Sequence, residues 1–231
     1  GAVYERAFAL TRNVESPPEL FQIMYGLSTN RGLGEKFLEG LSIAKEMASY
    51  SDAAGDKAGY AVAHRFYGTM LVFLPDYEQA KGHLENALSA YEELNSRRLV
   101  DKYGHDPKAL SLVFLSKLQN YQGFADRSAA LIQEAVAHAE TLDFPYGVAH
   151  VHWLAGEIFF ELNDPKQSEK HATDQIKIAT EKGFPLLESG GLIFSGWAEH
   201  RRGESGSLGK IESAFNHTES ISPGMQTLIY L

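Results

Sequence analysis

Residues 144–185 read FPYGVAHVHWLAGEIFFELNDPKQSEKHATDQIKIATEKGFP, and this stretch decides the fold. It opens on Phe144-Pro145 and closes on Phe184-Pro185, the same dipeptide 40 residues later. Near its middle, Asn163 is a helix stop signal and Asp164-Pro165 a start signal. The aspartate offers an N-cap oxygen, and a proline at the first helical position has no N–H to leave unsatisfied. The stretch therefore predicts two helices joined by a tight turn.

The same helical period runs through most of the chain. One helix face, with apolar spacings of 4, 3 and 3, is formed by Leu84, Leu88, Tyr91 and Leu94. Further start signals lie at Ser16-Pro17-Pro18-Glu19, Asp76-Tyr77-Glu78-Gln79 and Asp106-Pro107, and stop signals at Gly123, Gly183 and Gly203. No convincing alternating strand of five or more residues occurs, so the predicted class is all-α.

A small residue recurs in the middle of five predicted helices. The intervals are 42, 48, 40 and 40 residues, and the positions are Gly26, Gly68, Ser116, Gly156 and Gly196. Glycine inside a helix costs about 1 kcal/mol relative to alanine, so the recurrence needs a reason, and close approach of a second helix is the simplest. Twelve residues after the last four stand Ala80, Ser128, Ser168 and Leu208, which are mostly small again. The first unit fits this pattern poorly.

This spacing resembles the tetratricopeptide repeat (TPR), whose 34-residue unit has small residues at its eighth and twentieth positions. The resemblance implies a right-handed α-solenoid of antiparallel helix pairs, here with repeats of about 40 residues. A single domain over residues 1–231 is expected, with five pairs near 17–50, 56–94, 107–140, 145–181 and 185–219. Residues 3–13 and 224–231 look like parts of adjoining pairs, so a fragment of a longer array is expected.

A narrower resemblance rests on three features of the sequence. They are the long connector 95–105, the "YG-x-DP" element at Tyr103 to Pro107, and "GFP" at Gly183 to Pro185. Together they resemble the C-terminal TPR-like regions of large bacterial regulators, which also carry a class III adenylate/guanylate cyclase domain or a P-loop ATPase. The resemblance implies a regulatory segment in a signalling protein; neither catalytic domain lies in these residues.

Composition limits the partners. The chain has 30 acidic and 21 Lys and Arg residues, a net charge of −9, and no cysteine. An acidic chain without basic clusters argues against nucleic acid. The longest near-apolar stretch, 66–74, is too short for a membrane span. We expect a cytoplasmic protein with no disulfide, since the lack of cysteine fits a reducing compartment.

No catalytic constellation stands out. Gly203 to Lys210 departs from the P-loop pattern and reads as a turn between helices. His150 and His152 point to different faces of a helix, and the remaining histidines are scattered. We therefore expect no catalytic residues, no metal and no cofactor, and hence no enzyme activity in this segment.

The concave groove is the candidate site. In the TPR family, ligand-facing positions lie three before and one, four and five after the small residue of each first helix. Carried over to this chain, they give the candidate binding residues Arg65, Thr69, Phe73, Lys117, Asn120, Tyr121, Trp153, Glu157, Trp197, His200 and Arg201. Aromatic and arginine side chains are enriched at interaction hot spots. Cations in such a groove would suit an acidic or carboxylate-ended peptide.

Two alternatives remain open for these residues. Trp153 and Trp197 could pack between repeats instead of facing a ligand. Tyr103 and His105 could fold into the groove as a gate, or belong to a helix-capping loop held by Asp106.

Two functions follow. The first is a non-catalytic module that binds a protein or peptide, or domains of its own parent chain, and regulates an attached cyclase or ATPase. The alternative is a self-contained sensor that binds a short peptide or small molecule in the groove. The apolar residues Met225, Leu228, Ile229 and Leu231 would also favour a homodimer.

Overall fold

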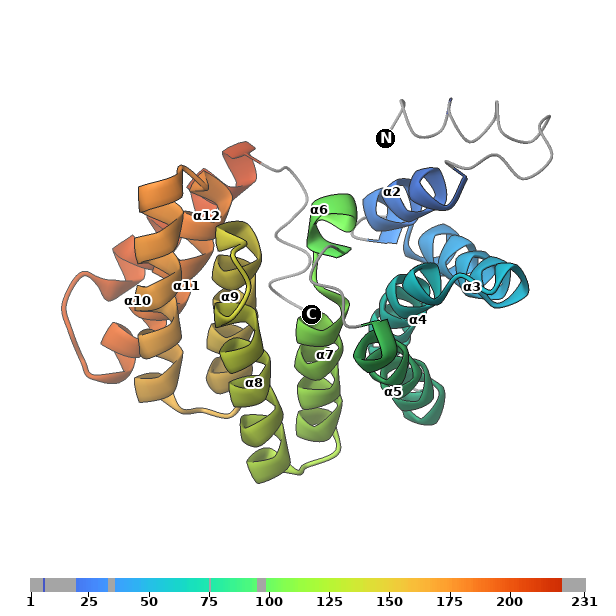
Figure 1. Cartoon of the computed structure of the whole chain (residues 1–231). Coiled ribbons are helices and arrows are strands. Elements are labelled where there is room, and N and C mark those ends of the chain that lie inside the picture. The colour runs from blue at the N-terminus through green and yellow to red at the C-terminus, as the bar shows by residue number, and fades with distance from the viewer. Residues whose placement is uncertain (1–5, 7–19, 33–35, 75, 95–98, 222–231) are drawn as a thin grey trace. The chain divides into compact units, whose positions relative to one another are not determined.

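The structure is a computed structural model, and it describes residues 6, 20–32, 36–74, 76–94 and 99–221. These residues hold eleven α-helices and no strand, which confirms the all-α prediction (Figure 1). The chain divides into two compact units, Gly1–Tyr103 and Gly104–Leu231. That all the pairs form one domain stays a prediction, and residues 3–13, apart from Arg6, and residues 224–231 lie outside the described residues.

Each unit is a succession of helix pairs whose members pack on their neighbours in the chain. The first unit contains α2 (Leu20–Gly32), α3 (Phe37–Ala54), α4 (Lys57–Val72), α5 (Tyr77–Leu94) and the short α6 (Leu99–Tyr103). The second contains α7 (Pro107–Tyr121), α8 (Ala125–Glu140), α9 (Pro145–Glu161), α10 (Pro165–Lys182), α11 (Pro185–Arg201) and α12 (Ser207–Ile221). Within the second unit the first helices of successive pairs also touch, α7 with α9 and α9 with α11.

The helix ends follow the polar signals of the sequence. Asp164 accepts a hydrogen bond from the Gln167 N–H at 3.0 Å, and Asp106 accepts one from the Ala109 N–H at 2.8 Å. These aspartates satisfy backbone donors that the first helical turn leaves free. At the stop signals, Gly183 takes a φ of +72°, a left-handed conformation that suits glycine. The expected start at 16–19 lies outside the described residues.

The recurring small residues lie where the two helices of a pair meet. A Cβ added to Gly68 would lie 2.8 Å from Leu84 Cγ and 3.1 Å from the Leu84 backbone nitrogen, so α5 approaches α4 too closely for a side chain. In the next pairs a serine hydroxyl spans the contact. Ser116 donates to the Ser128 carbonyl at 2.8 Å, and Ser168 donates to the Gly156 carbonyl at 2.9 Å. The inference of close helix approach is confirmed at these positions.

The first pair follows the same rule in a different register from the one expected. Ser28 donates to the Gly40 carbonyl at 2.7 Å, across the same 12-residue separation as the serine contacts of the later pairs. The residue equivalent to Gly68 is therefore Ser28, 40 positions earlier, and the assignment of Gly26 was wrong. The sequence pattern favoured Gly26, whereas the buried Ser28 occupies the helix contact.

The second unit has a core that joins three consecutive helices. Its buried members, from α9, α10 and α11, are Ala149, Trp153, Ala172, Ala179, Leu187 and Phe194. Alanine on α10 lets the larger side chains of α9 and α11 come close. Within the described part of the chain, no helix has the combined length and apolar character that crossing a bilayer would need.

Candidate functional site

Four aromatic rings and one arginine form a buried cluster in the first unit. Arg65 on α4 is only 4% exposed, and its Nη2 donates to the Tyr25 hydroxyl at 2.8 Å. Its guanidinium carbon lies 5.7 Å from the Tyr25 ring centroid and 5.3 Å from that of Phe66. Tyr103 on α6 closes the cluster, with its ring 5.7 Å from Tyr25 and 5.8 Å from Phe21. We call these five residues the Arg65 cluster.

The Arg65 cluster has hydrogen-bond donors without acceptors. Arg65 Nε and the Tyr103 hydroxyl are buried and have no hydrogen-bond partner among the described residues, and the same holds for the hydroxyl of Thr69, four residues after Arg65 on α4. Arg65 also forms no ion pair with a described residue. Burying a guanidinium is costly unless it is paired, and the neighbouring rings compensate only part of that cost. The cluster thus holds a buried cation and donors that no described residue satisfies.

In the second unit, by contrast, a buried cation is paired with carboxylates. Lys117 on α7 is 5% exposed, and its Nζ lies 2.6 Å from Glu157 Oε1 and 3.3 Å from Glu161 Oε1, both on α9. Asn120 Nδ2 also donates to Glu161 Oε2, at 2.8 Å. One ammonium therefore faces two carboxylates, and this network carries a net negative charge.

Two opposing effects act on the pKa of Lys117. Burial alone would lower it, but the negative charges of Glu157 and Glu161 outweigh burial and raise the pKa above its ordinary value. Burial also raises the pKa of the neighbouring Tyr121, and the two carboxylates add to that effect. Lys117 is therefore a permanently charged, internally compensated cation.

The two tryptophans have different surroundings. Trp153 is buried in the core of the second unit, and its indole lies so close to Gly190 that an added Cβ would come within 2.9 Å of it. Packing between repeats therefore describes Trp153. Trp197 is half-buried, and its ring meets Phe160 edge-on at a centroid distance of 4.8 Å. Phe160 is 42% exposed, so this pair offers an aromatic surface.

The two proposed gate residues belong to different units. Tyr103 lies in the Arg65 cluster, so the connector does bring an aromatic ring to a predicted groove residue. His105 instead lines a pocket with Asp106 and His150 in the second unit, and its ring lies 5.4 Å from that of His150. Because Asp106 caps α7, the capping-loop interpretation fits the His105 end of the connector.

The remaining candidates lie at the surface. Phe73 and Tyr121 are 40% and 37% exposed, and His200 and Arg201 are exposed near the end of α11. The structure brings Lys117, Asn120 and Glu157 into one network; it does not bring His200 or Arg201 to them.

Sequence reasoning missed Tyr25 and Phe21. Tyr25 stands three before Ser28, as Arg65 stands three before Gly68, so their hydrogen bond joins equivalent positions of adjacent repeats 40 residues apart. A strict step of 40 residues back from Gly68 would have found it. The register error at Gly26 concealed this signal.

Comparison with known proteins places the fold but not a family. No protein-family model matches the chain, and no curated protein matches it. A Rap protein complexed with Competence and Sporulation Factor superposes with a TM-score of 0.71 at 12% identity, over 93% of this chain and 57% of the Rap chain. A Podosopora anserina putative kinesin light chain with nearly identical TPR-like repeats gives a TM-score of 0.59 at 10% identity, over 90% of this chain and 99% of that one.

The fold is TPR-like. This confirms the resemblance stated from the spacing of small residues, and it agrees with the helix-pair contacts described above. The present chain spans 57% of the length of the Rap chain.

Proposed function

We propose that this chain is a non-catalytic recognition module that binds a carboxylate-bearing peptide segment of a partner protein at the Arg65 cluster. One observation carries the proposal: a nearly fully buried arginine forms no ion pair with a described residue, and its Nε and the buried hydroxyls of Thr69 and Tyr103 have no hydrogen-bond partner there. A planar guanidinium binds a carboxylate with two parallel hydrogen bonds, and the hydroxyls of Thr69 and Tyr103 could complete the oxygen shell.

The position of the cluster in the repeat supports this proposal. Arg65 and Thr69 occupy two of the positions that face ligands in the TPR family, and α6 adds Tyr103 from the connector. The Rap protein with a similar fold was solved complexed with Competence and Sporulation Factor, which shows that this fold can bind a partner. The Lys117 network is a weaker candidate for an acidic ligand, because two carboxylates already hold its cation.

A binding screen with matched peptides tests the proposal. The probes are fluorescein-labelled octapeptides in three sets: Asp- or Glu-containing with an amidated end, neutral with a free C-terminal carboxylate, and neutral with an amidated end. We expect one of the first two sets to bind and the third not to bind. The set that binds identifies the carboxylate as a side chain or a chain end.

Two arginine variants control this screen. Arg65→Gln should weaken binding about 100-fold, roughly 2.7 kcal/mol, because truncating one side of a buried charged hydrogen-bonded pair costs several kcal/mol. The exposed Arg201→Gln should leave binding unchanged. Equal binding by Arg65→Gln and the parent chain, or no binding in any set, would overturn the proposal.

The attachment to a larger enzyme is part of the proposal. The "YG-x-DP" and "GFP" elements support a cytosolic regulator in which this module follows an adenylate/guanylate cyclase or an ATPase and transmits occupancy to it. Sequencing the gene outward from the codon for Val3 tests this directly. A continuous frame with a cyclase or P-loop domain supports it, and a free-standing frame contradicts it.

The second candidate is a self-contained sensor of a small carboxylate. The packing of Arg65 against the rings of Tyr25 and Phe66, with Tyr103 packed on Tyr25, favours it, since a small anion fits such a site without an extended groove. In the same assay, competition by free amino-acid-sized carboxylates at concentrations equal to the peptides would support the sensor. Competition by peptides alone would support the module.

A further inference from the structure

A pair of histidines occurs twice in the molecule, at equivalent positions of two repeats. His64 and His83 meet with their Nδ1 atoms 3.0 Å apart, and His152 and His171 meet with theirs 3.1 Å apart. In both pairs the histidines are 19 residues apart, and the second pair follows the first by 88 positions. The repeat between the two pairs has Leu112 and Leu131 at these positions, and the repeat after the second pair has Leu192 and Ile211.

Each pair also has a carboxylate on the preceding helix. His64 Nε2 lies 3.4 Å from Asp52 Oδ1, and His152 Nε2 lies 3.6 Å from Glu140 Oε1. Both carboxylates stand 12 residues before their histidine. Two repeats of this chain therefore share the same set of one carboxylate and two histidines. An apolar contact at these histidine positions would be sufficient for packing.

Only the second pair has a third ligand among the described residues. Asp174 stands three residues after His171 on α10, on the same helix face, and the ligand atoms of His152, His171 and Asp174 all lie within 4.8 Å of one another. The corresponding residue of the first pair is Asn86, which is exposed. The two histidines are each 3% exposed, whereas Asp174 is half-buried.

We propose that His152, His171 and Asp174 bind a divalent transition-metal ion of the Zn²⁺ type. Two imidazole nitrogens and a carboxylate are the ligand types that Zn²⁺ takes, and they leave one position for water or a fourth group. Two nitrogens on a tetrahedral Zn²⁺ lie about 3.3 Å apart, given Zn–N bonds of ~2.0–2.1 Å. The Nδ1 atoms are already close to that separation, and the half-buried Asp174 side chain is the member that must move.

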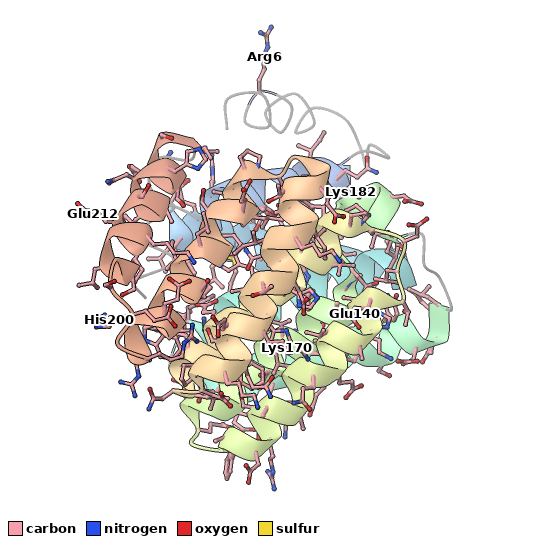
Figure 2. All side chains as sticks on the ribbon, turned by 90° about the vertical axis from the view of Figure 1, so that its left-hand side faces the viewer. Arg6, Glu140, Lys170, Lys182, His200 and Glu212 are labelled. Carbon is pink, nitrogen blue, oxygen red and sulfur yellow. The ribbon has the colours of Figure 1, made fainter. Side chains whose placement is uncertain are left out.

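The surroundings of the pair suit metal binding. When His152 ligates through Nδ1, its ring proton resides on Nε2, which faces Glu140. Metal-bound histidines commonly donate their other N–H to a carboxylate. Figure 2 labels Glu140 and the exposed Lys170 on α8 and α10.

The charge of Lys170 opposes the metal. It lies directly before His171 in the chain, and its positive charge disfavours a nearby divalent cation. Glu140 and Asp174 offset it. Lys170→Gln should therefore tighten metal binding, which is an effect that a purely structural histidine pair would not show.

The test titrates Zn²⁺ or Co²⁺ alone into the full chain after treatment with EDTA. We expect one Zn²⁺ per chain by elemental analysis, a higher Tm, and a visible Co²⁺ absorption band of tetrahedral type. Asp174→Asn keeps the shape of the side chain and should weaken binding at least about tenfold. Glu140→Gln should weaken it about tenfold through the His152 ring.

A leucine double variant and its counterpart control for folding. His152→Leu with His171→Leu copies the apolar residue types of the sibling repeats, so it should fold and lose the metal. His64→Leu with His83→Leu should retain it. Asn86→Asp supplies the missing third ligand in the first pair and should raise the stoichiometry from one to two.

Three results would overturn the proposal. They are absence of Zn²⁺ binding by the parent chain, unchanged binding by Asp174→Asn and the His152 and His171 double variant, and equal loss of binding in the His64 and His83 double variant.

Discussion

Two buried cations, one in each unit, show how similar side chains can have different surroundings. Arg65 and Lys117 are 4% and 5% exposed, and both stand at ligand-facing positions of the repeat. Lys117 is held by two carboxylates of the next repeat, while Arg65 is held by a tyrosine hydroxyl and aromatic rings and pairs with no carboxylate of the described residues. A buried charge that is compensated internally stabilises its own repeats. One that is not compensated is the site that we propose for a ligand.

The largest expected effect comes from removing the Lys117 ammonium. Lys117→Met leaves Glu157 and Glu161 close together without their counter-ion, and breaking a buried pair in this way costs about 3 kcal/mol of unfolding free energy. Arg65→Met leaves no unpaired carboxylate behind and should change that free energy by less than about 1 kcal/mol, or raise it. Urea denaturation of the two variants measures both values. Equal losses would contradict the difference between the cations.

Replacing the glycine where two helices meet should have opposite effects on stability in the two units. A Cβ at Gly68 meets Leu84 at 2.8 Å, whereas one at Gly156 meets Phe194 at 3.4 Å. Gly68→Ala should therefore lower the unfolding free energy by about 2 kcal/mol through overpacking. Gly156→Ala should raise it by up to about 1 kcal/mol, since alanine favours a helix. Thermal melts read out both, and a stabilised Gly68→Ala would show that the α4–α5 contact is looser than described.

The smallest effect is a pH dependence in the first unit. Burial lowers the pKa of His64, against the opposing effect of Asp52, and burial together with His64 lowers that of His83. The folded state therefore keeps both rings neutral while the unfolded chain protonates them below about pH 6.5. The unfolding free energy should fall as the pH drops from about 6.5 toward the lowered values.

A double variant isolates this contribution. His64→Leu with His83→Leu removes these two titrating rings and should make the acid limb of the stability curve less steep, measured by urea denaturation between about pH 5 and pH 8. An acid limb as steep as that of the parent chain would show that these rings do not cause it.

The fold was readable from sequence because its determinants are local and periodic. Asp164-Pro165 and Gly183 mark helix ends by backbone chemistry that does not depend on the rest of the chain. The spacing of Gly68 and Gly156 reports helix contacts directly. The register of the first pair failed because a buried serine at position 28 is as small as a glycine in this contact, and only the hydrogen bond to Gly40 reveals it.

The candidate site was readable in part. Repeat positions identified Arg65 and Lys117, but sequence alone could not show which cation finds a carboxylate, because that depends on neighbours 40 residues away. The histidine pairs were not predicted from the sequence for the same reason. His152 and His171 are 19 residues apart on different helices, and this spacing matches no local metal-binding motif. Residue spacing along one helix does not report contacts between helices.

The most direct test of the central claim observes the Arg65 Nε–H group itself. In a ¹H–¹⁵N spectrum of the arginine-labelled chain, Arg65→Gln assigns the resonance by its disappearance. The account predicts a resonance protected from solvent exchange that shifts on addition of the carboxylate peptide selected in the screen and stays in place with its amidated or neutral counterpart. A resonance that exchanges rapidly with water, or that responds equally to both peptides, would contradict a buried cation awaiting an anionic ligand.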